Sequence, residues 1–309
     1  MKKNQLSVVI SVFNGEKELD DCLRSVSFAD EIVIVNNSST DKTEDVVRKY
    51  TDKIFTRPNN PMLNVNKNFG FSKATGEWIL CLDADERVTP ELAKEIKTKI
   101  GNWKLEIGNS VNGFWLPRKN IIFGKWIKHT GWYPDYQLRF FRKDKGKFLQ
   151  EHVHEMIKVE GQTEYLINNL LHYNYTTVSQ FLSKLNIYIT NEAEQLVKNG
   201  YEFKWQDSIR FPVKEFLSRF FAREGYKDGL HGLVLSMLMA FYHLLIFATI
   251  WEKKNFERHE NNNFLDEVDQ ESKKSYKDLF FWINSEKIKL IKNPFKKLIH
   301  KIARKSAHN

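Results

Sequence analysis

Cysteine is scarce in this sequence, and this scarcity limits the cellular compartments in which we expect the protein to work. The chain has two cysteines in 309 residues, Cys22 and Cys81, and both lie in apolar surroundings. No group of cysteines and histidines has the spacing of a zinc site, and two cysteines are too few for a disulfide framework. The first residues also lack the long apolar run of a signal peptide. We therefore expect the folded part of the chain to lie in the reducing cytosol.

Two further absences narrow the functional classes. No glycine-rich phosphate loop follows the first apolar run, Leu6–Val12, which argues against a nucleotidyltransferase. The net charge of +9 suggests an anionic partner, which is nucleic acid, an anionic membrane or an anionic substrate. However, residues 286–309 alone hold eight Lys or Arg and one Glu. A nucleic-acid enzyme should carry its positive charge along its working groove, so we expect no nucleic-acid partner.

What the sequence does contain is an alternation of strands and helices. The run Leu6–Val12 precedes a predicted helix over Glu18–Val26, and Glu31–Val35 precedes a predicted helix over Thr43–Tyr50. A third helix and a further strand follow. This order predicts a largely parallel sheet with right-handed crossovers, in which the polar residues after the strands share one edge.

An acidic pair ends the strand predicted at Trp78–Leu82. Asp83 and Asp85 follow that strand one residue apart, at the end of the sheet where open α/β folds bind ligands. Two aspartates can share one Mg²⁺ or Mn²⁺ whose shell is completed by water and phosphate oxygens. The alternative is an acidic turn without function, because an isolated Asp-x-Asp is common.

The acidic pair belongs to a set of motifs in a particular order. The set is Ser11-Val12-Phe13-Asn14, Asn36-Asn37-Ser38-Ser39-Thr40-Asp41, Asn66-Lys67-Asn68 and Asp83-Ala84-Asp85. It resembles the nucleotide-sugar half of inverting family 2 glycosyltransferases of GT-A fold. The resemblance implies an α/β fold with a Rossmann-like half and a mixed, mostly parallel sheet, which a helical extension follows in this chain.

The resemblance also implies a donor site. Its members are Ser11, Phe13, Asn14, Asn37, Lys67, Asp83 and Arg139. Ser11 and Phe13 are expected beside the base, Lys67 in place of a usual arginine, and the two aspartates at the ribose and the metal-bound diphosphate. Family members usually carry an aspartate where this chain has Asn36-Asn37. Asparagine can still accept from a uracil N–H but lacks the charge, which weakens the expectation of a UDP donor.

An aromatic loop, residues 123–142, follows an edge strand predicted at Gly113–Asn120. Aromatic ring faces stack on the C–H surfaces of sugars. For the tryptophans alone, a core turn is an equal alternative. Asp135 lies among these rings, so we expect burial to raise its pKa and to suit it as the general base for an acceptor hydroxyl.

A second resemblance narrows the branch of the family. Residues 132–139, followed by Val153-His154-Glu155, are similar to the branch that adds glucose to the inner core of bacterial lipopolysaccharide. This similarity implies His154 as a third metal ligand and Glu155 as a reserve base. From the residues alone, a His-x-His pattern is more often an exposed polar strand.

The last third of the chain predicts helices that bind a membrane. A helix over Leu230–Trp251 would carry no formal charge and be about 33 Å long, enough to cross a hydrocarbon core of roughly 30 Å. Basic residues flank it on both sides, so we expect it to lie in the interface or to be buried. Residues 252–278 predict a solvated connector. Residues 286–309 predict a basic amphipathic helix on anionic lipid, with a solvated basic tail as the alternative.

These inferences lead to one hypothesis. We expect an inverting hexosyltransferase that moves a sugar, glucose by preference, from a UDP donor to a lipid-linked saccharide such as the lipopolysaccharide inner core. It would use Mg²⁺ or Mn²⁺ and work peripherally at the cytoplasmic face of the inner membrane. The expected parts are a donor half at 1–112, an acceptor half at 113–176 and a helical extension at 177–309. The alternatives are a protein or other polysaccharide acceptor, and a catalytically silent membrane-docking relative.

Overall fold

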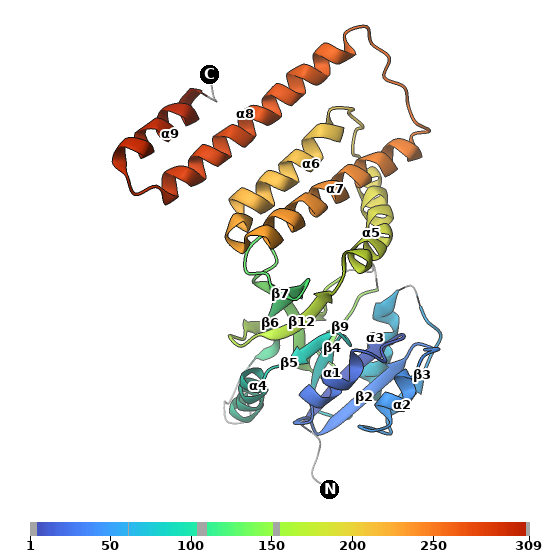
Figure 1. The fold of residues 1–309 in the computed structure, drawn as a ribbon. Coiled ribbons are helices and arrows are strands. Elements are labelled where there is room, and N and C mark those ends of the chain that lie inside the picture. Colours follow the sequence, from blue (N-terminus) through green and yellow to red (C-terminus); the bar gives the residue numbers. More distant parts are fainter. Residues whose placement is uncertain (1–4, 61, 104–109, 151–154, 307–309) are drawn as a thin grey trace. The chain divides into compact units, whose positions relative to one another are not determined.

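The chain forms two compact units. The computed structural model describes residues 5–60, 62–103, 110–150 and 155–306. The first unit, the α/β unit, is Met1–Ile121 with Tyr133–Asn174, and the second, the helical unit, is Ile122–Trp132 with Tyr175–Asn309. In Figure 1 the blue strands belong to the α/β unit, and the orange and red helices belong to the helical unit.

The α/β unit is built on a mixed sheet. Its strands are β1 (Leu6–Val12), β2 (Glu31–Asn36), β3 (Ile54–Thr56), β4 (Trp78–Leu82), β5 (Glu86–Val88), β6 (Val111–Ile122), β8 (Asp135–Arg142), β11 (Gln162–Tyr165) and β12 (Leu170–Tyr175), with a small β9 (Gly146–Lys147) and β10 (Lys158–Val159) pair beside it. The strand order is β3-β2-β1-β4-β8-β6-β12-β5, and β11 also pairs with β6. β1 runs parallel to β2 and β4, and β2 to β3, whereas β8 runs antiparallel to β4 and β6. The α/β fold that the sequence predicts is confirmed.

Helices cover both faces of this sheet. They are α1 (Leu19–Ser25), α2 (Thr43–Val47), α3 (Leu63–Lys73) and α4 (Pro90–Trp103). Leu23 of α1, Val47 of α2 and Leu92 of α4 pack in one core with Trp78. Phe71 of α3 packs in a second core with the strand residues that point the other way. Burial on both faces explains why the strands are continuous apolar runs.

Strand β6 differs from its prediction. The sequence predicts an edge strand at Gly113–Asn120, whereas β6 lies between β8 and β12. Its side chains fit an interior place, because Phe114 and Leu116 are buried in the core. The interior position brings Arg118 and Asn120 against residues of both neighbouring strands.

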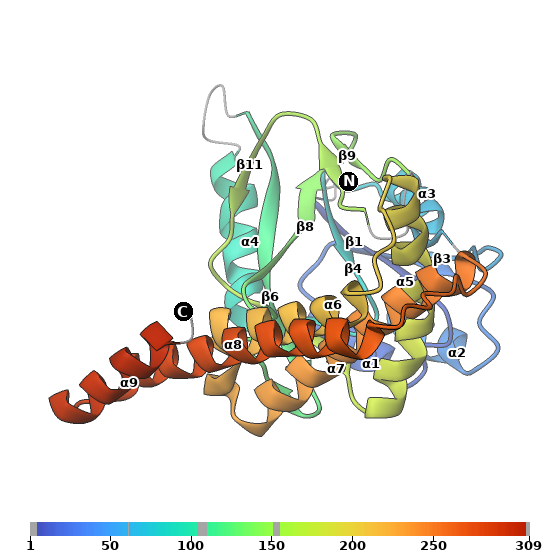
Figure 2. The same cartoon turned by 90° about the horizontal axis from the view of Figure 1, so that it is seen from above.

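The helical unit consists of helices and one short strand. They are β7 (Lys125–Trp126), α5 (Val178–Lys198), α6 (Asp207–Leu217), the π-helical turn η1 (Ser218–Ala222), the 3₁₀ turn η2 (Gly225–Asp228), α7 (Leu230–Lys253), α8 (Phe264–Leu290) and α9 (Pro294–Ser306). The core joins Ile122 and Ile127 to Phe181 of α5 and Ile246 of α7. Figure 2 shows α6, α7 and α8 running alongside one another, and α6 packs against both.

The loop over residues 122–132 is anchored within the helical unit. The carboxylate of Asp228, which is buried, accepts hydrogen bonds from the backbone N–H groups of Lys128 (3.3 Å) and His129 (2.8 Å). Arg219 in the π-helical turn donates to the carbonyl of Thr130 (3.0 Å). The first part of the aromatic loop is therefore fixed by helices that come about ninety residues later in the chain.

The solvated connector predicted over residues 252–278 is wrong from Phe264 onward, where α8 begins. The buried residues of α8 are polar, namely Glu271, Asn284 and Glu286, so apolar periodicity does not reveal the helix. Arg210 of α6 holds Glu271 with two hydrogen bonds of 2.8 Å. The helix predicted in the basic tail is present as α9.

Helix α7 combines a buried and an exposed side. Among the described residues it is the one helix long and apolar enough to cross a membrane, judged by length and composition. Leu235, Tyr242 and Ile246 are buried in the core of the helical unit, whereas Met237 and Phe241 are exposed. One side of α7 is therefore a core element of that unit.

Candidate active site

Hydrogen bonds join the loops that follow β1 and β2 at the carboxyl edge of the sheet. The backbone N–H of Asn14 donates to Ser39 Oγ (2.9 Å), and Asn14 Oδ1 accepts from the backbone N–H of Thr40 (2.8 Å). Asn14 has a positive φ of 51°, which asparagine tolerates better than most residues. The neighbouring Phe13 is 46% exposed and offers its ring at this edge.

The amide of Asn37 links three elements beneath that edge. Its Nδ2 donates to Ser11 Oγ (3.0 Å), and its Oδ1 accepts from Asn66 Nδ2 of α3 (2.8 Å). Asn37 is 1% exposed. Ser11 Oγ can also donate to Asn37 Oδ1 (3.3 Å), so these contacts do not by themselves distinguish asparagine from aspartate at position 37. The predicted contact of Asn37 with a base stays a prediction.

Asp83 lies between two cations that come from different elements. Lys67 Nζ of α3 contacts Asp83 Oδ1 at 2.6 Å, and Arg139 of β8 contacts Asp83 Oδ2. Burial acts to raise the pKa of Asp83, but the charges of Arg139 and Lys67 outweigh it and hold that pKa well below its usual range. Three residues predicted for the donor site are thus brought together, with Asp83 in contact with both cations.

Glu86 organises the turn after β4, although no role for it was predicted. It is fully buried, and its Oε1 lies 3.3 Å from both Arg118 Nη1 and Arg139 Nη2. Its Oε2 accepts a hydrogen bond from the backbone N–H of Asp83 (2.9 Å). The sequence does show a third acidic residue directly after Asp85, at the start of β5, and this pattern could have pointed to Glu86. Glu86 aligns both arginines with the acidic turn.

Asp135 begins β8 and faces a polar environment rather than aromatic rings. Its Oδ2 accepts from Arg118 Nε (2.8 Å) and Asn120 Nδ2 (3.2 Å), and its Oδ1 accepts from Gln137 Nε2 (3.0 Å). The predicted rise in its pKa is wrong. Burial does act to raise it, but the charge of Arg118 and the hydrogen bonds from Asn120 and Gln137 lower the pKa of Asp135. Asp135 is therefore ionised. Its carboxylate can accept a proton only after these donors move away from its oxygens.

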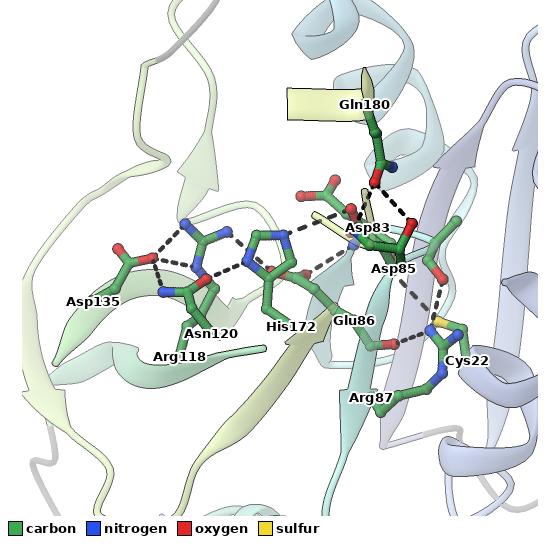
Figure 3. A network of polar contacts seen from close by, with 12 residues as sticks. Cys22, Asp83, Asp85, Glu86, Arg87, Arg118, Asn120, Asp135, His172 and Gln180 are labelled. Atoms are coloured by element: carbon green, nitrogen blue, oxygen red, sulfur yellow. Dashed lines mark hydrogen bonds and ion pairs between the residues drawn. The ribbon is translucent and has the colours of Figure 1, made fainter. Parts of the chain in front are cut away.

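A chain of polar contacts runs from Asp135 to Asp85 (Figure 3). Asn120, fully buried on β6, bridges Asp135 and His172 of β12: its Oδ1 lies 2.6 Å from His172 Nδ1. His172 Nε2 in turn lies 3.6 Å from Asp85 Oδ2. His172 reaches the acidic turn because β12 pairs with β5, which places His172 opposite Glu86. Sequence reasoning missed His172.

Asp85 and His172 suit a divalent cation as a pair. Among the described residues, no three His, Cys, Asp or Glu side chains are grouped as a complete metal site. A carboxylate oxygen and a ring nitrogen 3.6 Å apart can nevertheless share one ion whose other ligands are water and phosphate oxygens. The other nitrogen of His172 is held by an amide oxygen, as is usual for metal-binding histidines. The donor set therefore fits Mg²⁺ or Mn²⁺.

The remaining predicted residues lie in different places. His154 falls outside the described residues. Glu155 Oε1 accepts from Asn64 Nδ2 of α3 (3.1 Å) and from the backbone N–H of Gln150, which ties it to its own loop. Trp126, with Lys128 Nζ 4.5 Å from its ring centroid, belongs to the helical unit, whereas Asp135 belongs to the α/β unit.

The strand order and the polar edge define the class of the protein. Four parallel strands end in polar loops, and the antiparallel β8 and β6 bring a second carboxylate to the same network. This is an α/β fold of the GT-A class. Residues 7–158 match the model of the family described as glycosyl transferase family 2. The chain therefore carries a family 2 glycosyltransferase domain, which spans residues 7–158.

Individual relatives extend over most of the chain. The lipopolysaccharide core biosynthesis glycosyltransferase LpsC of Rhizobium meliloti is 28% identical over 81% of this chain and 93% of its own length. An uncharacterized glycosyltransferase of Rickettsia typhi is 26% identical over 82% of this chain and 88% of its own length. The crystal structure of S. aureus TarS 1–349 in complex with UDP-GlcNAc superposes with a TM-score of 0.40 at 14% identity, over 83% of this chain and 93% of that one.

Proposed function

We propose that this protein transfers a hexose, glucose by preference, from a UDP-sugar to a lipid-linked saccharide such as the lipopolysaccharide inner core, with inversion at the anomeric carbon. The observation that carries the proposal is one partly buried polar network. Lys67, Asp83 and Arg139 lie at one end of it and suit a diphosphate, and Asp135 lies at the other end and suits a general base. The saccharide acceptor is proposed from the similarity to LpsC.

The donor end would bind the nucleotide sugar through residues that now neutralise one another. Lys67 and Arg139 both pair with Asp83 and are nearly buried, so their charges are already positioned and partly desolvated. A diphosphate entering beside them would compete with Asp83 for these cations and gain from their preorganisation. Ser11, Phe13, Asn14 and Asn37 are proposed to shape the pocket for the base.

Mg²⁺ or Mn²⁺ is proposed at the acidic turn. Asp85 and His172 would hold it, with Asp83 as a further ligand once Lys67 and Arg139 turn toward the diphosphate. When bound, the ion neutralises charge that develops on the departing diphosphate. His154, which lies outside the described residues, stays a candidate ligand.

Asp135 is proposed as the general base. The acceptor oxygen would form its bond to the anomeric carbon as the bond to the diphosphate oxygen breaks, and UDP would leave with that electron pair. The proton of the acceptor hydroxyl would pass to Asp135 Oδ1 or Oδ2, which requires the acceptor to displace one of the donors that hold the carboxylate. Glu155 is kept as the reserve base.

Residues 177–309 are proposed to hold the enzyme peripherally on the cytoplasmic face of the inner membrane. Helix α9 leaves Phe295, Leu298 and Ile302 exposed by 52% or more, although it packs against α8. Lysines flank this apolar surface, which suits a lipid surface that is both apolar and anionic. Residues 1–112 and 113–176 are proposed as the donor and acceptor halves.

The proposal is tested by offering UDP-glucose, UDP-galactose, UDP-GlcNAc and GDP-mannose to the purified protein, with and without Mn²⁺ and a truncated lipopolysaccharide acceptor. We expect Mn²⁺-dependent, acceptor-dependent release of UDP, fastest with UDP-glucose. Preferred use of GDP-mannose would refute the UDP assignment. Turnover only with a protein or polymer acceptor would refute the lipid-linked acceptor, and no hydrolysis of any donor would indicate a silent relative.

A further inference from the structure

Asn120 joins Asp135 at the base end of the site to His172 at the metal end, beside a second connection through Arg118 and Glu86. It is fully buried on β6, and its two amide atoms have partners on two different strands: Nδ2 faces Asp135 Oδ2 of β8 (3.2 Å), and Oδ1 faces His172 Nδ1 of β12 (2.6 Å). Figure 3 shows this bridge between the labelled Asp135 and His172.

The orientation of the Asn120 amide follows from its neighbours. An ionised carboxylate has no proton to donate, so the amide NH₂ must face Asp135 and the amide oxygen must face His172. The reversed amide would place two oxygens against each other at Asp135. Arg118 and Gln137 also donate to Asp135 and keep its carboxylate in the acceptor role.

The orientation of the amide in turn fixes the imidazole. An amide oxygen can only accept, so Nδ1 of His172 must carry a proton. In the neutral ring the lone pair then lies on Nε2, the nitrogen that faces Asp85 at 3.6 Å. A ring with its proton on Nε2 would have no lone pair to offer a cation at Asp85.

We propose that Asn120 is a positioning residue that transmits the orientation set by Asp135 to His172, so that the metal-facing nitrogen of His172 is kept free of a proton. The inference deepens the proposed function, because it rests on a divalent cation at Asp85 and His172. It makes the Asn120 bridge between Asp135 and His172 a determinant of metal affinity.

Mn²⁺ binding in the presence of UDP, measured by calorimetry, tests this role. Asn120→Leu should weaken Mn²⁺ by about tenfold or more, the lower end of the effects seen for outer partners of metal-binding histidines. Gln137→Leu is the matched control: it removes a donor to Asp135 without a contact to His172 and should leave Mn²⁺ affinity unchanged.

Ring ¹⁵N chemical shifts give a second readout that a general loosening of the site would not produce. The His172 signals are assigned by their absence from the spectrum of His172→Gln. In the wild type the shifts should place the proton of His172 on Nδ1, and in Asn120→Leu they should show a mixture of the two tautomers. Thermal unfolding confirms that each variant is folded.

Three outcomes would overturn the inference alone: equal Mn²⁺ affinity of the wild type and Asn120→Leu, an equal loss in Gln137→Leu, or a wild-type ring with its proton on Nε2. Failure of the wild type to bind Mn²⁺ with UDP would overturn the proposed metal role itself, and the inference with it.

Discussion

The two units of this protein differ in which charged and apolar side chains they bury and which they expose. In the α/β unit, Glu86 is fully buried, Asp83 and Asp135 are partly buried, and all three are held by cations, while every residue of β4 is buried. In the helical unit, α8 buries polar residues and α9 exposes large apolar ones. Burying charge in the α/β unit costs desolvation free energy, a cost that is expected at a catalytic site. Exposed apolar surface in the helical unit is expected where a partner covers it.

The largest effect should come from the base. Asp135→Asn removes the proton acceptor while Asn keeps the shape of the side chain, so we expect transfer to fall by about 10³-fold or more. UDP affinity, measured by calorimetry, should stay within a few-fold. Loss of UDP binding together with transfer would show that Asp135 supports the donor site instead, and would remove the distinction between the two ends of the network.

The next largest effect should come from the metal end. Asp85→Asn should lower transfer by about 10²-fold, the size expected for one electrostatic contribution to a transition state. Chelation by EDTA should abolish turnover in the wild type, and added Mn²⁺ should restore it there more fully than in the variant. Full activity in EDTA would exclude a required divalent cation.

The membrane-binding role proposed for the helical unit is tested by reversing charges on α9. Replacing Lys296, Lys301 and Lys305 of α9 by Glu should weaken binding to phosphatidylglycerol-containing vesicles by about 100-fold or more, because each lysine near an anionic surface contributes about 1 kcal/mol. The matched control replaces three exposed lysines of the α/β unit, which are Lys42, Lys94 and Lys97. Co-sedimentation with vesicles measures both. An equal loss in the control would mean that net charge, not α9, governs binding.

The smallest effect concerns stability in the α/β unit. Glu31 is 6% exposed and accepts hydrogen bonds from Thr75 N (2.7 Å) and Thr75 Oγ1 (2.9 Å), with Ser7 and Lys53 also in contact. Burial acts to raise the pKa of Glu31, but the bonds from Lys53, Ser7 and Thr75 lower it to about 2. Glu31→Gln should therefore lower the free energy of unfolding by about 1–3 kcal/mol at neutral pH.

The sign of the pH dependence follows from that lowered pKa. The stabilisation by ionised Glu31 is fully present above its ordinary pKa of about 4.5 and is lost as the pH falls toward 2. Urea unfolding of both proteins at pH 7 and pH 3 should show the difference shrinking at the lower pH. Glu91→Gln, on exposed α4 surface, should show no such difference. A constant gap for Glu31→Gln would indicate a packing effect instead.

Local patterns were enough to predict the first half of the sheet. Leu6–Val12 is apolar apart from Ser7 and Ser11 because both faces of β1 are covered, and Asp83 follows β4 at the carboxyl end of that strand. The site beyond Asp83 depends on pairings between distant strands. His172 reaches Asp85 only because β12 pairs with β5, and no local pattern specifies that pairing.

The wrong pKa direction for Asp135 has the same origin. Rings at Trp132, Tyr133 and Tyr136 are its neighbours in sequence, but Arg118, its neighbour across the sheet, decides its charge. Helix α8 was missed for a different reason, since its attachment through Arg210 and Glu271 leaves no apolar stripe to recognise.

The assignment of residues 122–132 to the helical unit bears on how such a protein can change in evolution. The backbone passes between the units at three points, after Ile121, Trp132 and Asn174. A gene truncated after Asn174 would strip Ile122 and Ile127 of the helices that bury them. A single recombination point therefore cannot exchange the helical unit without separating the segment 122–132 from the helices that bury it.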